Sequence, residues 1–173
     1  HTCALPICII EVPMWPLSQK EFQHKPEENL IDGLFNRGIE SLKPNRMSHD
    51  AFLRAVISGG YPEIHKIESA RGRALRSGTY ISTYVERDIR DVGELRDITG
   101  FIRFFNVLAP RSGGLLNKAG LGNDANLSEM TINNYLGMLE MIYQASLLTA
   151  YHSNVSKRFI KAPKFYLTGS GFF

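Results

Sequence analysis

The chain has 173 residues, of which 43% are hydrophobic and 21% charged, and a formal net charge of +3. This composition is ordinary for a soluble globular protein and excludes disorder as the main state, and the length allows one large domain or two small ones. The sequence has no apolar run of membrane-spanning length and no signal-peptide pattern, so a cytoplasmic location without a membrane contact is expected.

The N-terminal end is unusual because it begins with histidine rather than methionine. Residues 1–7 look like translated sequencing-adapter sequence, which predicts that residues 1–8 are not native; a genuine N-terminal strand is the alternative. The next run, residues 9–12, is short and apolar, as expected for a buried strand, and Pro13 and Pro16 end it. The chain is therefore expected to be an interior piece of a longer protein.

Two short helices are predicted next. Ser18 and Glu21 match the S-x-x-E pattern of a capping box, which predicts a helix from Gln19. Apolar residues within 30–34 indicate a second short helix that ends near Gly38.

Ser48 is predicted to cap a third helix. Its apolar residues Phe52, Leu53, Val56 and Ile57 recur at helical spacing. Gly59 and Gly60 are expected to end this helix. Pro62 then suits the first turn of another helix.

One long helix is predicted from Ser69 to Val92. Its apolar stripe runs through Leu75, Gly78, Ile81, Val85, Ile89 and Val92, in steps of three and four. Two pairs of opposite charge lie four residues apart, Glu86 with Arg90 and Arg87 with Asp91. Each such pair stabilises a helix by roughly 0.2–0.5 kcal/mol.

The C-terminal half is predicted to contain three helices and two strands. Thr99 is expected to cap the first helix, which carries Phe101, Phe104, Phe105 and Leu108 and ends before Pro110. A turn at 113–114 leads to a weaker helix over 115–124. Asn126 or Ser128 begins the clearest helix, whose apolar face comprises Ile132, Tyr135, Leu136, Leu139, Ile142 and Tyr143. Strands over 146–151 and 162–168, joined by 152–158, complete the element order of a winged helix.

Three motifs carry a resemblance to a known family. The first is Gly59-Gly60-Tyr61-Pro62-Glu63, and the second is Tyr84-Val85-Glu86-Arg87-Asp88, which is similar to a Y-x-E-R-D signature. The third, Lys161-Ala162-Pro163-Lys164-Phe165-Tyr166, is similar to a K-x-P-K-x-Y strand. Together they resemble a prokaryotic family of AAA-type ATPases with a C-terminal domain of unknown function 4143. The chain departs from the family at Gly169, where an aspartate is usual.

The resemblance implies a mainly α fold with a small β component. Residues 9–22 would be the end of an α/β ATPase core, including its last strand. Residues 23–97 would form a helical lid bundle with a long connecting helix, and residues 98–173 a truncated winged-helix-like domain. ATP and Mg²⁺ are implied for the longer parent, and its N-terminal ATPase core is the implied partner. The sequence contains no G-x-x-x-x-G-K-[ST] phosphate-binding loop, so no catalysis by this chain alone is expected.

The same resemblance implies nucleotide-proximal residues. In AAA-type ATPases of the signal-transducing branch a similar glycine-proline turn of the helical lid lies over the bound nucleotide, so Gly59, Gly60, Tyr61 and Pro62 are the candidates. Glycines allow close backbone approach, and the free N–H groups of a helix start attract anions. A plain turn between two helices is the alternative interpretation.

Tyr84, Glu86, Arg87 and Asp88 are the family-signature residues. Arg87 or Arg90 could serve as an arginine finger across a subunit interface. Each has an acidic residue four positions away, so a structural set of ion pairs is the favoured role.

The candidate DNA-binding residues are Asn133, Asn134, Lys157, Arg158, Lys161 and Lys164. Asparagine can recognise adenine, but the helix from Ser128 to Ala145 has no lysine or arginine to neutralise phosphates. A protein partner is therefore favoured; a DNA-binding winged helix and a pure interaction scaffold stay as alternatives. Cys3, Cys8 and the five histidines have no metal-ligand spacing, so neither a metal site nor a catalytic residue is predicted.

Overall fold

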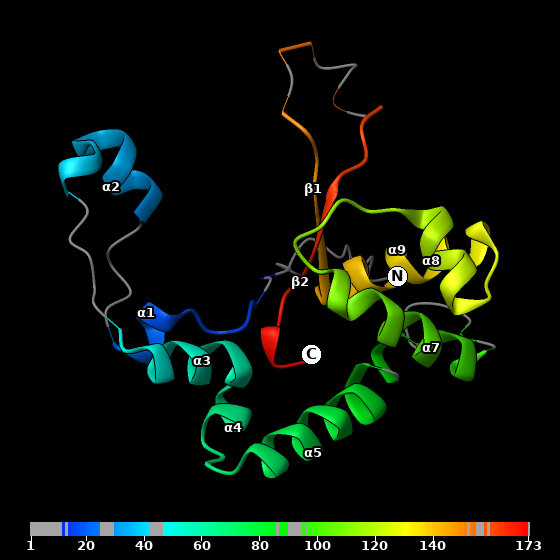
Figure 1. Ribbon diagram of the computed structural model, residues 1–173, viewed down its shortest axis with the longest axis horizontal. Coiled ribbons are helices and arrows are strands. Elements are labelled where there is room, and N and C mark those ends of the chain that lie inside the picture. Colours follow the sequence, from blue (N-terminus) through cyan, green and yellow to red (C-terminus); the bar gives the residue numbers. More distant parts are fainter. Residues whose placement is uncertain are drawn as a thin grey trace, which may run out of the picture.

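Figure 1 shows the computed structural model of the chain. The structure describes residues 12, 14–24, 30–41, 47–85, 87–89, 95, 97–151, 153–154, 158 and 160–172. This part contains eight α-helices and a single two-stranded antiparallel sheet, which confirms the mainly α fold with a small β component. None of its helices is long and apolar enough to cross a membrane. Residues 1–8, and all of the strand predicted over 9–12 except Val12, lie outside the described residues.

The two short N-terminal helices are as predicted. In α1 (Gln19–Phe22), the backbone N–H of Ser18 donates to the Glu21 carboxylate at 2.6 Å, and the N–H of Glu21 donates to the Ser18 hydroxyl at 3.3 Å. Helix α2 (Leu30–Arg37) ends before Gly38, whose φ of +75° suits glycine, and the 3₁₀ turn η1 (Ile39–Ser41) follows. Figure 1 shows α2 apart from the other helices.

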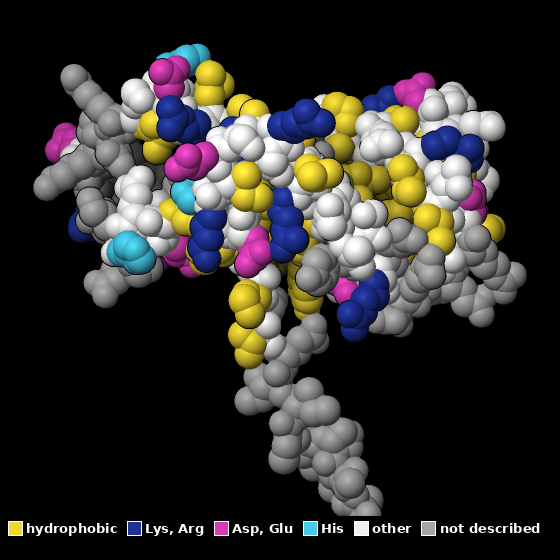
Figure 2. All heavy atoms as spheres, turned by 90° about the horizontal axis from the view of Figure 1, so that it is seen from below, with side chains coloured by type: hydrophobic (Ala, Val, Ile, Leu, Met, Phe, Trp, Pro, Cys, Tyr) yellow, Lys and Arg dark blue, Asp and Glu magenta, His cyan; other side chains and the backbone are white. Residues whose placement is uncertain are grey.

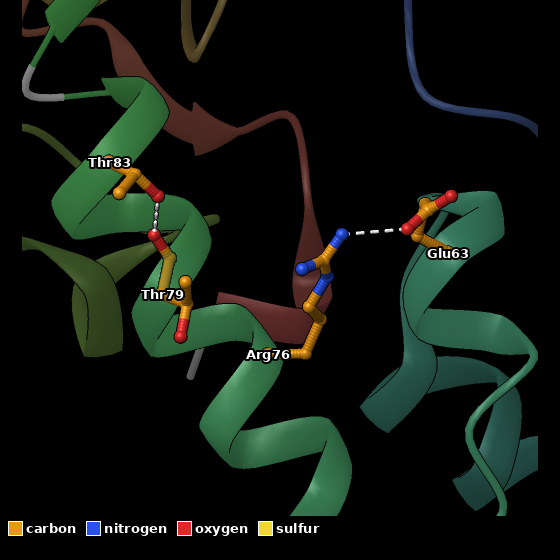
Figure 3. Close-up of polar contacts among 4 residues, drawn as sticks. All are labelled: Glu63, Arg76, Thr79 and Thr83. Atoms are coloured by element: carbon orange, nitrogen blue, oxygen red, sulfur yellow. Dashed lines mark hydrogen bonds and ion pairs between the residues drawn. The ribbon is translucent and has the colours of Figure 1, made fainter.

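Helices α3, α4 and α5 follow one another along one side of the molecule (Figure 1). Helix α3 (His49–Ser58) is capped by Ser48, as predicted, and α4 (Pro62–His65) begins at its proline. Helix α5 (Ala70–Tyr80) is capped by Ser69. The ion pair between Arg76 and Glu63, at 2.7 Å, joins α5 to α4 (Figure 3).

The long helix predicted from Ser69 to Val92 is not regular. It changes into a π-helical segment, η2 (Ile81–Val85). The hydroxyl of Thr79 donates to the Leu75 carbonyl at 2.9 Å, and the Thr83 hydroxyl donates to the Thr79 carbonyl (Figure 3). Hydroxyls that bond back to carbonyls perturb the regular ladder.

The apolar stripe predicted along that helix is only partly buried. Leu75 is 73% exposed, whereas Ile89, beyond the π segment, is fully buried. A π turn takes up more residues than an α turn, so a stripe spaced for a regular α-helix does not stay on one face. Val92 lies outside the described residues, and so does at least one member of each predicted ion pair.

The C-terminal half holds the core. It is built from α7 (Ile98–Leu108), the 3₁₀ turn η3 (Ala109–Arg111), α8 (Lys118–Ala125), α9 (Glu129–Met141), β1 (Ala145–Leu148) and β2 (Lys164–Leu167). The largest fully buried side chains here are Phe101, Phe104, Leu108, Leu121, Ile132, Leu139 and Phe165. The order of three helices followed by an antiparallel pair agrees with the prediction, with Ala145 opposite Leu167 and Leu148 opposite Lys164.

Several predicted boundaries in this half were wrong, and β2 in particular is shorter than the predicted 162–168. The cap of α7 is Asp97, not Thr99, because the Asp97 carboxylate accepts the Gly100 N–H at 2.8 Å. Helix α8 starts at Lys118 rather than 115, since Leu115 forms a β-bridge with Lys164. Strand β1 ends at Leu148 instead of residue 151.

Helix α8 ends and helix α9 begins at two different residues. Ser128 is the cap of α9, and its hydroxyl accepts the Thr131 N–H at 3.2 Å. Asn126 closes α8 in the left-handed conformation, with φ of 52°. Of the two starts proposed for the clearest helix, Ser128 is therefore correct.

Candidate functional site

The turn after α3 is enclosed by backbone from two distant parts of the chain. Gly59 has φ of +63°, and a Cβ added there would lie 2.8 Å from the Gly171 nitrogen. A Cβ added at Gly60 would lie 2.5 Å from the Leu17 carbonyl oxygen. The Leu17 N–H donates to the Gly60 carbonyl at 2.8 Å. Both positions therefore require glycine for a physical reason, namely close backbone approach.

Tyr61 connects this turn to the C-terminal half. Its hydroxyl donates to the Gln144 side-chain carbonyl at 3.1 Å, and its ring packs against that of Tyr80, with centroids 4.9 Å apart. Burial, and secondarily the neighbouring Tyr80, raises the pKa of the Tyr61 hydroxyl well above its usual range. Tyr61 therefore remains protonated and serves as a hydrogen-bond donor within the fold.

An open groove of about 460 Å³ runs beside the two glycines. It is lined by Pro16, Leu17, Ser18, Gln19, Met47, Phe52, Ala55, Val56, Gly59, Gly60, Thr168 and Ser170. We call this the α3 groove. One wall comes from the stretch before α1, the second from α3, and the third from the segment after β2. The walls thus come from three parts of the chain that are far apart in sequence.

The α3 groove is mostly apolar and uncharged. Among the described residues that line it, none is acidic, basic or a histidine. Its polar groups are the hydroxyls of Ser18, Thr168 and Ser170, the Gln19 amide and the backbone. Such a surface suits a flat, weakly polar group. It does not suit phosphates, which are bound by cationic side chains or by the N-terminus of a longer helix. Within the described residues, no group of three or more His, Cys, Asp or Glu could hold a metal ion.

The predicted nucleotide-proximal residues divide into two pairs. Gly59 and Gly60 line the α3 groove, whereas Tyr61 and Pro62 are not among its lining residues. Tyr61 is partly buried toward Gln144, and Pro62 is exposed at the start of α4. The structure therefore places only the glycine pair beside this groove.

The family-signature residues lie at the end of the π segment. Tyr84 falls within η2, and Arg87 and Asp88 are exposed just after it. Glu86 lies outside the described residues. The next residue, Ile89, belongs to the core cluster and anchors this segment to the C-terminal half.

The candidate DNA-binding residues are spread over two elements. Asn133 and Asn134 are exposed on α9, and Lys161 and Lys164 are exposed before and at the start of β2. The Arg158 guanidinium lies 5.4 Å from the centre of the Tyr151 ring, a cation–π contact. Lys157 lies outside the described residues. On the face drawn in Figure 2, lysine and arginine side chains are scattered among hydrophobic ones rather than gathered in one patch.

Sequence reasoning missed the C-terminal wall of the α3 groove. Gly169 was noted only as a departure from the family's aspartate, yet it is buried, and Gly171 approaches the α3 turn. A Cβ added at Gly171 would lie 3.1 Å from the Ser58 carbonyl oxygen. The sequence feature that could have indicated this wall is the pair of glycines on either side of Ser170, because such glycines are typical of a close backbone approach.

Comparisons with known proteins identify the family of this chain. The chain belongs to the family described as "Domain of unknown function (DUF8612)", whose profile matches residues 49–173. It is similar to the uncharacterized protein Rv2008c of Mycobacterium tuberculosis and to the uncharacterized protein Mb2031c of Mycobacterium bovis. Each is 28% identical over 118 residues, which is 68% of this chain and 27% of the relative. The chain thus spans about a quarter of the length of these relatives, and no solved structure matches it. The family description assigns no activity.

Proposed function

We propose that this chain is the lid and winged-helix-like part of a longer AAA-type ATP-binding protein, and that it has no catalytic activity by itself. The observation that carries the proposal is the apolar α3 groove beside Gly59 and Gly60. Its volume of about 460 Å³ is within the range of small-molecule sites. In this proposal the base of ATP lies in the α3 groove, while a separate ATPase core holds the phosphates and Mg²⁺.

Two further observations support the proposal. The curated relatives extend well beyond the aligned segment, which leaves room for an ATPase core in a protein of that size. The order α7, α8, α9, β1 and β2 is that of a winged helix, so residues 98–173 would be the winged-helix-like domain and residues 23–97 the lid. Residues 9–22 would then belong to the end of the core.

The winged-helix-like domain is proposed to bind a protein rather than DNA. The exposed residues of α9 include Met130 and Met141, which are 74% and 64% exposed, and the acidic Glu129 and Glu140. Methionine-rich surfaces accommodate protein partners, whereas acidic side chains repel phosphates.

DNA binding is the second candidate because of the basic side chains around β2. Strand alternation buries Phe165 and leaves Lys164 on the solvent side, and Lys161 is exposed as well. These two lysines could contact a phosphate backbone. In that case binding to duplex DNA would weaken steeply with salt and would be lost when both lysines are replaced by alanine.

The first test is the complete reading frame. A buried strand followed by G-x-x-x-x-G-K-[ST] upstream of residue 9 would support the ATPase core, and the absence of that motif would refute the proposal. The affinity of the complete protein for a fluorescent ATP analogue then tests the α3 groove. Phe52→Ala is expected to raise the Kd about tenfold, or about 1.4 kcal/mol, through lost contact with the base.

Leu53→Ala is the matched control. Leu53 lies on the same helix and is 42% exposed, similar to the 54% of Phe52, but it does not line the α3 groove. Its Kd should equal that of the wild type. Equal affinities for both variants would contradict the placement of the base, and ATP hydrolysis by the 173-residue chain alone would contradict the non-catalytic role.

A further inference from the structure

Two walls of the α3 groove are joined by one excursion of the chain. Leu17–Gln19 forms part of the first wall, and Met47, Phe52 and Val56 belong to the second. Between them lie α2 and η1, which together span residues 30–41. This segment, which we call the flap, therefore leaves from one rim of the α3 groove and returns to the other. In Figure 1 it stands away from the other helices.

The flap presents large apolar side chains to solvent. Phe35 is 81% exposed, Ile39 is 74% exposed and Leu34 is 36% exposed. Phe35 lies on α2, and Ile39 lies on η1, beyond the turn at Gly38. A helix of eight residues is only marginally stable without tertiary packing. The flap therefore exposes apolar side chains that could pack against another surface.

The outer surface of α3 offers a matching apolar face. Phe52 is 54% exposed, Val56 is 41% exposed and Met47 is 39% exposed, and all three line the α3 groove. No charged side chain interrupts the described lining of the groove. Two exposed apolar surfaces thus occur within one short stretch of the sequence, and burying them against each other would remove both from water.

The connections are long enough for the flap to reach the α3 groove. Six residue steps separate His24 from Leu30 and six separate Ser41 from Met47, and each can span up to about 20 Å. Helix α2 itself is only about 12 Å long. Tethering at both rims gives the flap an effective concentration in the millimolar range at this surface, which favours it over a second copy of the chain at ordinary protein concentrations.

We propose that the flap folds over the α3 groove, with Phe35 and Ile39 packing on Phe52 and Val56. In the closed state the flap controls access to the groove, so a ligand must displace it or bind beneath it. The inference concerns the regulation of the groove used in the proposed function. It does not require that the ligand be ATP.

Hydrogen exchange of the complete 173-residue chain, followed by mass spectrometry without nucleotide, tests the closure. A closed state populated about ten to one would slow exchange of the α2 amides about tenfold relative to an unstructured peptide. Val56→Asp places a charge in the contact surface and should return the flap to fast exchange. Leu75→Asp, on α5 at a position 73% exposed, is the matched control and should leave flap exchange unchanged.

Two further measurements keep the test decisive. Phe35→Asp changes the flap itself at an 81% exposed position, so it should speed flap exchange while the amides of α7 keep their protection. Protection should also be the same at two protein concentrations about fiftyfold apart. Fast flap exchange in the wild type would overturn the inference, and so would protection that rises with concentration, which would indicate a second copy. Neither outcome bears on the ATP-affinity test.

Discussion

Replacing Gly60 with alanine is expected to destabilise the fold by about 1–3 kcal/mol. The new methyl group would lie 2.5 Å from the Leu17 carbonyl oxygen and 2.7 Å from the Pro16 Cβ, so the stretch before α1 has to move. That movement weakens the 2.8 Å hydrogen bond from the Leu17 N–H to the Gly60 carbonyl, worth about 0.5–1.5 kcal/mol. The reduced freedom of the unfolded chain offsets about 0.4–1 kcal/mol.

Urea unfolding monitored by tryptophan fluorescence measures this effect. Trp15 is the single tryptophan of the chain and packs edge-on against Tyr143, with ring centroids 5.6 Å apart, so it reports on the stretch that has to move. A loss of about 1–3 kcal/mol corresponds to a fall of roughly 2–12 °C in Tm for a chain of this size. Detachment of that stretch alone would change the Trp15 signal before the main transition.

The matched control is Gly78→Ala. Gly78 lies in α5, and a Cβ added there meets nothing within 4 Å, so alanine should stabilise the helix by about 0.5–1 kcal/mol. If Gly60→Ala unfolds at the same urea concentration as the wild type while Gly78→Ala is more stable, the close approach at Gly60 does not determine its residue type. The reasoning on the α3 turn would then be wrong.

Three other changes have defined outcomes. Asp97→Ala should lower the free energy of unfolding by about 1 kcal/mol, because it removes the α7 cap. Thr99→Ala should change the free energy of unfolding by less than about 0.5 kcal/mol. Equal urea midpoints for the two variants would contradict the assignment of the cap to Asp97. The raised pKa of Tyr61 keeps its phenol protonated in the folded state, so wild-type stability should fall as pH rises above about 10. Thermal melts of Tyr61→Phe should show a smaller loss over the same pH range, because Tyr135, whose pKa burial also raises, still contributes. In a gel shift at low salt no duplex DNA complex is expected, and a complex abolished by Lys161→Ala with Lys164→Ala would instead favour the DNA-binding function.

Local signals in the sequence predicted most helix boundaries. Ser18, Ser48, Ser69 and Ser128 each cap a helix in the structure. A cap needs only a side chain that accepts a hydrogen bond from an N–H two or three residues away, so neighbouring residues suffice to reveal it. The same rule allowed an error before α7, where Asp97 and Thr99 are both suitable cap residues.

The features that the sequence could not reveal depend on contacts between distant segments. The glycine pair after α3 signalled a turn, but only the fold shows that Gly171 lies against Gly59 and Leu17 against Gly60. For that reason no local sequence pattern indicates the α3 groove. The exposure of Phe52 and Val56 is a related case, because helical spacing predicts an apolar face but does not say what covers it.

The number of residues between Ser69 and Ile89 is fixed by α5 and by the π-helical segment η2 that continues it. Each residue turns an α-helix by about 100°, so the deletion of one residue within α5 would rotate everything beyond it by that angle. Ile89, which is fully buried, would then leave the core cluster. Members of the family are therefore expected to keep the number of residues between Ser69 and Ile89.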